Sequence, residues 1–383
     1  MRPFEAPSHF EKSASIRCMP SSRSFAEKRG VWLFARPSGD IGPATFSLSR
    51  TDSANTHRKP VWASAFACGA IPLEFSTIVD YARRARQGGA GSVWLSDHLF
   101  LDLSKYGGPD RREACFDPLV TLAALARAVP DVRLGTMVLL EALRPASVLA
   151  KALATLDCVS GGRLDVGLGA GWYEPEYAAI GIDMPKPGVR LDRLIDAVEV
   201  VKGLLGGGPL TYAGAHHGAT DATNRPPALQ QPRPRVFVGG KGDRLLRLAA
   251  EHADGWNTCW VWTTDAYRER RDALDAACTA IGRDPATVWR TLGLYALCGE
   301  DERDLERRFE RLREVSPKGV LDGVDLAEFR TGRLVGTVDE VRDQVGSWAE
   351  LGIDTLILGA GAVPFQISSA DDVELLLEAC TSS

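Results

Sequence analysis

Hydrophobic and polar positions follow two repeating patterns from Val61 almost to the end of the chain. Short apolar runs are typical of buried strands, and longer segments with apolar residues three or four positions apart are typical of helices that pack on a sheet. The first pattern predicts eight strands, at 61–67, 92–96, 133–138, 163–168, 235–239, 255–259, 289–297 and 354–358. The second predicts helices at 74–87, 117–128, 145–160, 190–205, 243–252, 264–281, 301–314, 338–351 and 370–380.

This alternation of strands and helices predicts an α/β fold. Helices that join parallel strands make right-handed crossovers, and eight such units close most economically into a (β/α)8 barrel of the TIM type. An open doubly wound sheet is the alternative, because periodicity alone does not distinguish a closed sheet from an open one. In the helix over 338–351 the apolar residues share one stripe, and Thr337 stands at the position of an N-cap.

Two segments interrupt the alternation. Residues 1–58 are rich in Ser, Pro, Arg and Thr, so we expect a poorly ordered N-terminal extension before a barrel domain over 59–383. Residues 206–235 contain the pair His216-His217 and several prolines without clear periodicity. A long stretch of this kind inside a compact domain is typical of a functional loop, and we expect a lid over the barrel mouth.

Charge and composition narrow the class of protein. The 383 residues carry a net charge of -5, and Lys and Arg are scattered among acidic residues, which argues against nucleic acid as a partner. No run of about 18 apolar residues and no apolar secretory segment is present, so we expect a cytoplasmic protein that does not enter a membrane. The eight cysteines are far apart and form no Cys/His cluster, which predicts reduced thiols and no metal site.

The strongest candidate for proton chemistry follows the second predicted strand. The run Ser92-Val93-Trp94-Leu95-Ser96 leads straight into Asp97 and His98, and catalytic groups of barrels stand at the carboxyl ends of strands. A histidine with an ordinary pKa near ~6.5 gives or takes a proton at neutral pH, and Asp97 would keep its surroundings polar. His98 is therefore the candidate catalytic residue. A histidine that only hydrogen-bonds within the polar rim is the alternative that the spacing leaves open.

Two glycine-rich turns are candidates for binding a phosphate. The run Gly167-Leu168-Gly169-Ala170-Gly171 spans the end of the fourth strand, and Gly239-Gly240-Lys241-Gly242 follows the fifth and leads into a helix. Missing side chains let backbone N–H groups approach a phosphate, and a helix N-terminus adds a favourable partial charge. Neither turn is a complete dinucleotide or ATP motif. Four tryptophans stand near strand ends, and we expect no more than two of them to contact a ligand: Trp172, Trp256, Trp260 and Trp262.

Seven stretches, in this order, resemble the bacterial luciferase-like superfamily of barrel flavoenzymes, and within it the oxidoreductases that use the deazaflavin coenzyme F420. They are Ser96-Asp97-His98-Leu99, Leu134-Gly135-Thr136-Met137-Val138, Ala150-Lys151 with Ala154-Thr155-Leu156-Asp157, Ser160-Gly161-Gly162-Arg163, Gly167-Leu168-Gly169-Ala170-Gly171-Trp172, Val238-Gly239-Gly240 and Ala253-Asp254-Gly255-Trp256. The chain departs from the pattern at Trp172, where sugar-phosphate dehydrogenases of the family carry a carboxylate. It departs again at Leu143-Arg144-Pro145, where the family usually has Arg-His-Pro.

The resemblance implies a luciferase-like barrel with a cofactor at its mouth. Asp97 and His98 match positions beside the reactive ring, and Met137-Val138 matches a bulge that backs the ring, often through a non-proline cis peptide. Ala170-Gly171 and Gly239-Gly240 match turns around the ribityl chain and phosphate. The candidate cofactor-binding residues are Asp97, His98, Thr136, Met137, Val138, Gly169, Ala170, Gly171, Trp172, Gly239, Gly240 and Lys241.

The function implied by the resemblance is an F420-dependent oxidoreductase that transfers a hydride to or from a small organic substrate, while His98 handles the proton. One alternative is a monooxygenase that uses reduced FMN and oxygen and is supplied by a separate reductase. A second is a flavin-binding protein without turnover. The expected partners are a small-molecule substrate, a flavin or F420 reductase, and a second copy of the chain in a homodimer.

Overall fold

The sheet at the centre of the molecule is parallel and curled. The computed structural model describes residues 74–364 and 366–381, so the predicted extension over 1–58 and the predicted first strand over 61–67 lie outside the described residues. The other seven predicted strands are all present. The parallel strands, in spatial order, are β1 (Ser92–Leu95), β4 (Arg133–Thr136), β6 (Leu164–Gly169), β9 (Val236–Gly239), β10 (Gly255–Trp260), β11 (Trp289–Gly299) and β12 (Leu334–Thr337), with β13 (Thr355–Gly359) also paired to β11 and β5 (Leu139–Leu140) to β6.

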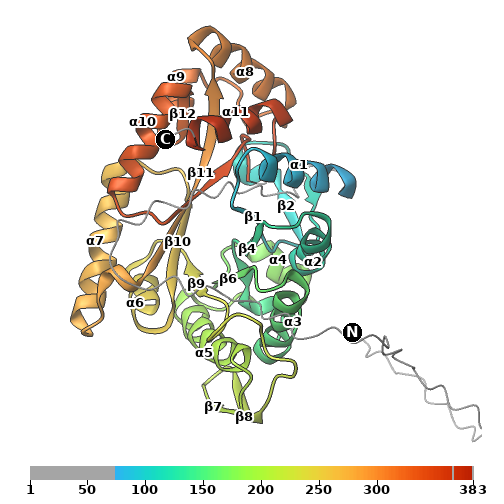
Figure 1. Cartoon of the computed structure of the whole chain (residues 1–383), viewed down its shortest axis with the longest axis vertical. Coiled ribbons are helices and arrows are strands. Elements are labelled where there is room, and N and C mark those ends of the chain that lie inside the picture. The colour runs from blue at the N-terminus through green and yellow to red at the C-terminus, as the bar shows by residue number, and fades with distance from the viewer. Residues whose placement is uncertain (1–73, 365, 382–383) are drawn as a thin grey trace, which may run out of the picture. The chain divides into compact units, whose positions relative to one another are not determined.

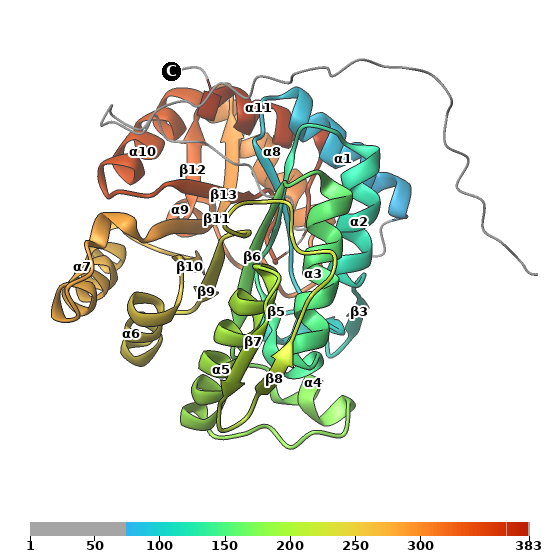
Figure 2. The same cartoon turned by 60° about the horizontal axis from the view of Figure 1, so that its bottom comes forward.

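Helices cover the outer face of this sheet, as Figures 1 and 2 show. All nine predicted helices are present. They are α1 (Phe75–Gln87), α2 (Pro118–Ala128), α3 (Ala146–Ser160), α5 (Pro187–Leu205), α6 (Asp243–His252), α7 (Thr264–Ala280), α8 (Glu302–Val315), α10 (Val338–Glu350) and α11 (Ala370–Thr381). The fold is therefore α/β and TIM-barrel-like. In the part of the chain that the structure describes, no helix is long and apolar enough to cross a membrane.

Several short elements were not predicted by the pattern, some after the carboxyl ends of strands and others between α8 and α10. They are the antiparallel pair β2 (Phe100–Asp102) and β3 (Arg112–Ala114), helix α4 (Glu174–Ala179), helix α9 (Leu326–Arg330) and strand β12. Each has six residues or fewer, which is too short for a periodic signal. Strand β12 leads directly into α10, whose N-cap is Thr337 as predicted. There the Thr337 side chain and Glu340 form a capping box.

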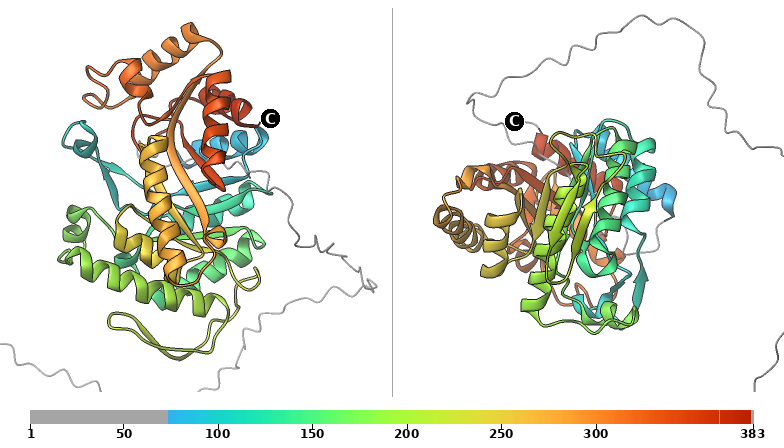
Figure 3. Two further views of the ribbon diagram at one scale, coloured as in Figure 1. Left: turned by 90° about the vertical axis from the view of Figure 1, so that its left-hand side faces the viewer. Right: turned by 90° about the horizontal axis from the view of Figure 1, so that it is seen from below.

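Residues 206–235 do not form the expected lid. They contain a hairpin of β7 (Leu210–Ala213) and β8 (Gly218–Ala222), which packs against α5 on the outside of the sheet (Figures 2 and 3). The Tyr212 hydroxyl donates to Asp196 Oδ1 at 2.8 Å, and His217 Nε2 lies 2.5 Å from Glu141 Oε1. The structure differs from the prediction because the hairpin follows α5, which carries the chain away from the carboxyl ends of the strands.

The inside of the curled sheet is filled by large rings that lie over glycines. Trp94 of β1 packs against Phe237 of β9 with ring centroids 5.7 Å apart, and Trp289 of β11 contacts both. A Cβ atom at Gly135 would lie 2.2 Å from the Trp94 ring, and one at Gly167 would lie 2.5 Å from the Phe237 ring. The glycines of the strands therefore provide the room that the rings occupy. The layer between the sheet and the helices is mainly aliphatic.

Candidate active site

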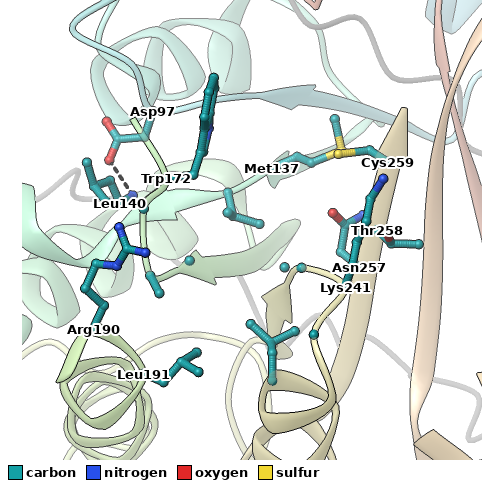
Figure 4. Close-up of a pocket in the computed structure, with 18 of the residues that line it drawn as sticks. Asp97, Met137, Leu140, Trp172, Arg190, Leu191, Lys241, Asn257, Thr258 and Cys259 are labelled. Atoms are coloured by element: carbon teal, nitrogen blue, oxygen red, sulfur yellow. Dashed lines mark hydrogen bonds between the residues drawn. The ribbon is translucent and has the colours of Figure 1, made fainter. Parts of the chain in front are cut away.

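A cavity of about 680 Å³ opens at the carboxyl ends of β1, β5, β6, β9 and β10 (Figure 4). All the predicted cofactor-binding residues except Thr136 line it: Asp97, His98, Met137, Val138, Gly169, Ala170, Gly171, Trp172, Gly239, Gly240 and Lys241. Thr136 is fully buried, and its hydroxyl donates to Gly167 O and accepts from Gly167 N–H. It joins β4 to β6 behind the cavity. The cavity is where parallel α/β folds place their ligands.

His98 is held by a carboxylate that the sequence analysis did not identify. Its Nδ1 lies 2.9 Å from Glu176 Oε2, and the other oxygen of Glu176 accepts the backbone N–H of Leu99 at 2.8 Å. The Glu176 side chain is 3% exposed and that of His98 is 16% exposed. Because a carboxylate accepts hydrogen bonds, Nδ1 carries the hydrogen, and Nε2 of the neutral ring is the basic nitrogen.

The carboxylate of Asp97 binds the guanidinium of Arg144, so its role is structural and not proton transfer. Its carboxylate accepts hydrogen bonds from Arg144 at 2.6 and 3.2 Å and from the backbone N–H of Leu140 at 3.0 Å. Arg144 also pairs with Asp117, the N-cap of α2. Burial raises the pKa of Asp97, and the bonds from Arg144 oppose that change. Asp97 therefore fixes the strand end next to His98 and connects it to Leu140 in the cavity wall.

Three basic side chains reach the cavity: Arg190 from the first turns of α5, and Lys241 and Arg244 from the start of α6. Arg190 and Lys241 approach from opposite sides in Figure 4. The buried Nε of Arg190 has no hydrogen-bond partner among the described residues, and neither does Thr258 Oγ1 in the opposite wall. Arg244 pairs with Asp192 on the surface. Polar atoms without partners beside a cavity are suited to a polar ligand.

The glycine turns fit around the peptide between Met137 and Val138. This non-proline peptide is cis, as the resemblance implied. A Cβ atom at Gly169 would lie 2.5 Å from a γ-carbon of Val138, and one at Gly239 would lie 2.9 Å from the other. Gly240 has φ of +149°, and its carbonyl accepts the indole N–H of Trp256 at 2.8 Å. The absent side chains at Gly169 and Gly239 thus leave room for Val138 between the two turns.

Two of the four tryptophans line the cavity. Trp172 is 56% exposed, and its ring meets the His98 ring edge to face with centroids 6.3 Å apart. Trp260 forms part of the opposite wall and stacks on Tyr295. Trp256 and Trp262 instead pack on Tyr267 in the core. The structure therefore assigns Trp172 and Trp260 to the cavity wall and Trp256 and Trp262 to the core. Spacing along the chain does not give this distinction.

The sequence analysis missed Glu176, Arg190, Arg244, Asn257 and Thr258, all of which line the cavity. Glu176 had a usable signal, since it lies one helical turn beyond the glycine-rich loop at a strand's carboxyl end. Asn257 and Thr258 sit inside the predicted strand over 255–259 and gave none. No group of three or more His, Cys, Asp or Glu residues in the described ranges could hold a metal ion, and His216 and His217 bond to α5 and Glu141 instead.

Comparison with known proteins agrees with this geometry. Residues 44–355 match the luciferase-like monooxygenase family. An F420-dependent hydroxymycolic acid dehydrogenase from Mycobacterium tuberculosis is 30% identical over 77% of this chain and 79% of its own length. An F420-dependent glucose-6-phosphate dehydrogenase from Kineococcus radiotolerans is 32% identical over 64% and 71%. A monooxygenase from Streptomyces bottropensis has a similar structure, with a TM-score of 0.68, 25% identity, and coverage of 83% of this chain and 98% of its own.

The chain has a curled parallel sheet, and a histidine and basic residues surround a cavity at the carboxyl ends of its strands. These features together define a barrel enzyme. The chain belongs to the luciferase-like monooxygenase family, and it is an oxidoreductase. The family match begins at residue 44, within the segment predicted as an N-terminal extension.

Proposed function

We propose that the protein is an F420-dependent oxidoreductase that transfers a hydride to or from a small organic substrate. The observation that carries the proposal is the cavity in which His98 and its partner Glu176 stand at one strand end and three basic side chains stand around the glycine turns. The curated relatives named above, whose names state F420 dependence, support the same cofactor. F420, when bound, supplies or accepts the hydride.

The residues of the cavity fit a phosphate-bearing, planar cofactor. Gly239 and Gly240 bring backbone close to the cavity, and Arg190, Lys241 and Arg244 supply positive charge for anionic groups of the cofactor. Thr258 and Arg190 both line the cavity, and Thr258 Oγ1 and Arg190 Nε have no hydrogen-bond partner among the described residues. Met137, Val138 and Leu140 form an apolar surface suited to a flat ring.

His98 would handle the proton that accompanies the hydride. In the oxidation of an alcohol, His98 Nε2 would take the proton of the substrate hydroxyl and a bound F420 would accept the hydride, which would leave a carbonyl product. The Glu176 carboxylate holds Nδ1–H and stabilises the imidazolium that forms. In the reverse direction His98 returns the proton to the oxygen. The dyad thus supports either direction of transfer.

A titration of the full chain with F420 and, separately, with FMN tests the proposal. Saturable binding of F420 with weaker binding of FMN, followed by a change in F420 absorbance when candidate alcohols or ketones are added, is the expected result. Preference for FMN and oxygen consumption in the presence of a flavin reductase would instead favour the monooxygenase. That alternative is supported by the 25% identity to a monooxygenase of the same fold. Binding of either cofactor without turnover would favour a flavin-binding protein.

A further inference from the structure

A second chamber of about 390 Å³ adjoins the cofactor cavity. The two share the residues Tyr106, Lys241, Cys259 and Trp260, so the chamber and the cavity lie side by side. The rest of its wall comes from Val261, Tyr295 of β11, Ala362 and the segment between α8 and β12. None of the sequence patterns indicated this chamber, because much of its wall belongs to short loops and to the unpredicted helix α9.

Flat aromatic groups form one side of the chamber. Trp260 stacks on Tyr295 with centroids 5.1 Å apart and an interplanar angle of 21°. Burial raises the pKa of Tyr295 well above its ordinary value, and burial also raises the pKa of Tyr106. Both phenols therefore stay protonated and can donate hydrogen bonds. This side of the chamber suits a flat or apolar body that carries a hydrogen-bond acceptor.

The charges of the chamber are not balanced. Arg333 Nη1 donates to the carbonyls of Phe329 and Thr331 at 3.1 and 3.2 Å, its buried Nε has no hydrogen-bond partner, and it forms no ion pair within the described residues. Burial lowers the pKa of Arg333, as expected for a cation without a bound carboxylate. Lys241 lies 4.5 Å from the Trp262 ring centroid and also has no ion-pair partner in the described ranges. Glu328 is the acidic residue of the wall.

We propose that this chamber binds the substrate and that the substrate is an organic monocarboxylate. Its carboxylate would lie at Arg333, and its apolar body would extend along Tyr295 and Trp260 toward the cofactor cavity. Nη1 of Arg333 already donates to two backbone carbonyls and Nε is buried, so Nη2 is the guanidinium nitrogen left to donate a charge-assisted hydrogen bond to a carboxylate. Arg333 and Lys241 are the cations of the wall, and Lys241 is assigned to the anionic groups of the cofactor, so Arg333 is the cation left to pair with a single substrate carboxylate. The catalytic part of this inference rests on the proposed function, but the binding part does not.

A pair of matched probes tests the inference: 3-phenylpropanoate and its neutral amide, titrated by calorimetry into the full-length protein, alone and with saturating F420. We expect the carboxylate to bind at least 10-fold more tightly than the amide. Arg333→Met keeps much of the apolar stem and should remove that preference without weakening the amide. Glu328→Gln should strengthen carboxylate binding several-fold, because it removes a like charge. Arg268→Gln, at an exposed arginine of α7, is the control and should change neither.

Equal binding of the two probes by the wild type, no binding of either, or an unchanged preference in Arg333→Met would each overturn the inference. If Arg333→Met does not fold, Arg333→Gln and Glu328→Gln carry the test, since loss of the charge at position 333 should remove the preference and loss of the charge at position 328 should increase it. The result is separable from the proposed function. Failure to bind F420 or FMN contradicts the proposed function, whereas the carboxylate preference is read from protein without cofactor.

Discussion

At the scale of single residues, the position of His98 was predictable and its chemistry was not. Its place at a strand end follows from the sequence, but the choice between proton transfer and a passive rim residue depends on its partner. Glu176 lies 78 positions away and bonds to His98 Nδ1. A buried carboxylate on Nδ1 fixes the ring tautomer, which favours the proton-transfer role.

Replacing His98 with alanine tests that role. If His98 transfers a proton in the rate-limiting step, His98→Ala should lower turnover by roughly 100-fold or more with little change in cofactor affinity. Steady-state kinetics and a cofactor titration on the same preparation measure both quantities. His252→Ala is the matched control, since His252 pairs with Glu199 on the surface side of α6 and should leave turnover unchanged. A His98 variant with wild-type turnover would remove the residue from the mechanism.

Gly242 offers the cleanest test of the phosphate site. Nothing lies within 4 Å of a Cβ atom there, and its φ of -77° suits any residue, whereas a Cβ atom at Gly240 would meet Leu245 and φ there is +149°. Because aspartate and serine are both good N-caps, Gly242→Asp and Gly242→Ser should each fold normally. We expect Asp to weaken binding of F420 by about 10-fold or more through repulsion of its phosphate, and Ser to change it little. Equal affinities in a titration of both variants would place the phosphate elsewhere.

Some residues of the cavity wall are predictable from the sequence and others are not, because their positions depend on different physical causes. Gly169 and Gly239 were predicted to bind the cofactor because glycine-rich turns after strands are visible in the chain itself, and in the structure they line the cavity and leave room for Val138. Thr136 was predicted to contact the cofactor, but it does not line the cavity, whereas the next residue, Met137, does. Side chains alternate between the two faces of a strand, so a shift of one position moves a side chain to the other face. Arg190 and Thr258 were missed because only the folded chain shows that their polar atoms lack partners.

At the scale of elements, long periodic helices were predicted within a few residues and short ones were not predicted at all. Helix α6 spans Asp243–His252 as expected, whereas α4 and α9 carry too few residues for periodicity to show. The sequence predicts a lid over 206–235 because so long a stretch shows no clear periodicity, and the hairpin of β7 and β8 lies within it. Its binding to Asp196 and Glu141 is a tertiary property that the local sequence does not encode.

The capping box of α10 gives a prediction at this scale. Thr337→Ala removes the oxygen that accepts the Glu340 N–H, so it should lower the free energy of unfolding by ~1 kcal/mol. Thr337→Ser keeps the hydroxyl and should cost much less. Urea denaturation of both variants measures the difference, and a loss of similar size in the two would show that the threonine methyl group matters more than the cap.

At the scale of the whole molecule, stability in acid depends on carboxylates that join neighbouring strands of the sheet. Asp254 precedes β10, and its two oxygens accept hydrogen bonds from Arg233 and from the backbone N–H of Val236 at the start of β9. Burial acts to raise the pKa of Asp254, but the bonds from Arg233 and Val236 outweigh it and hold the pKa below its ordinary value. A lowered carboxyl pKa adds stability above the unfolded-state pKa, and that stability is lost as pH falls through the folded-state pKa.

Asp254→Asn should therefore lower the free energy of unfolding by about 3 kcal/mol at neutral pH, because Arg233 loses its charged partner. The difference from the wild type should shrink as pH falls below ~4, where the wild-type carboxylate begins to be protonated. Chemical unfolding of both proteins across this pH range measures the effect. A difference that does not vary with pH would mean that Asp254 acts through packing alone.

The rings and glycines inside the sheet have a consequence for how this protein can diversify. Trp94 occupies the space left by Gly135, so a larger residue at Gly135 requires a smaller one at Trp94 in the same step. At Gly167 a Cβ atom would also lie 2.3 Å from the backbone oxygen of Thr136, so a smaller residue at Phe237 would not by itself make room for it. Such coupled changes are rare in a lineage that accumulates substitutions one at a time. Tyr106 packs against these rings, whereas Arg333, in the loop before β12, is not part of that cluster. Descendants of this gene are therefore expected to change substrate through the loop of Arg333 and to inherit the barrel interior unaltered.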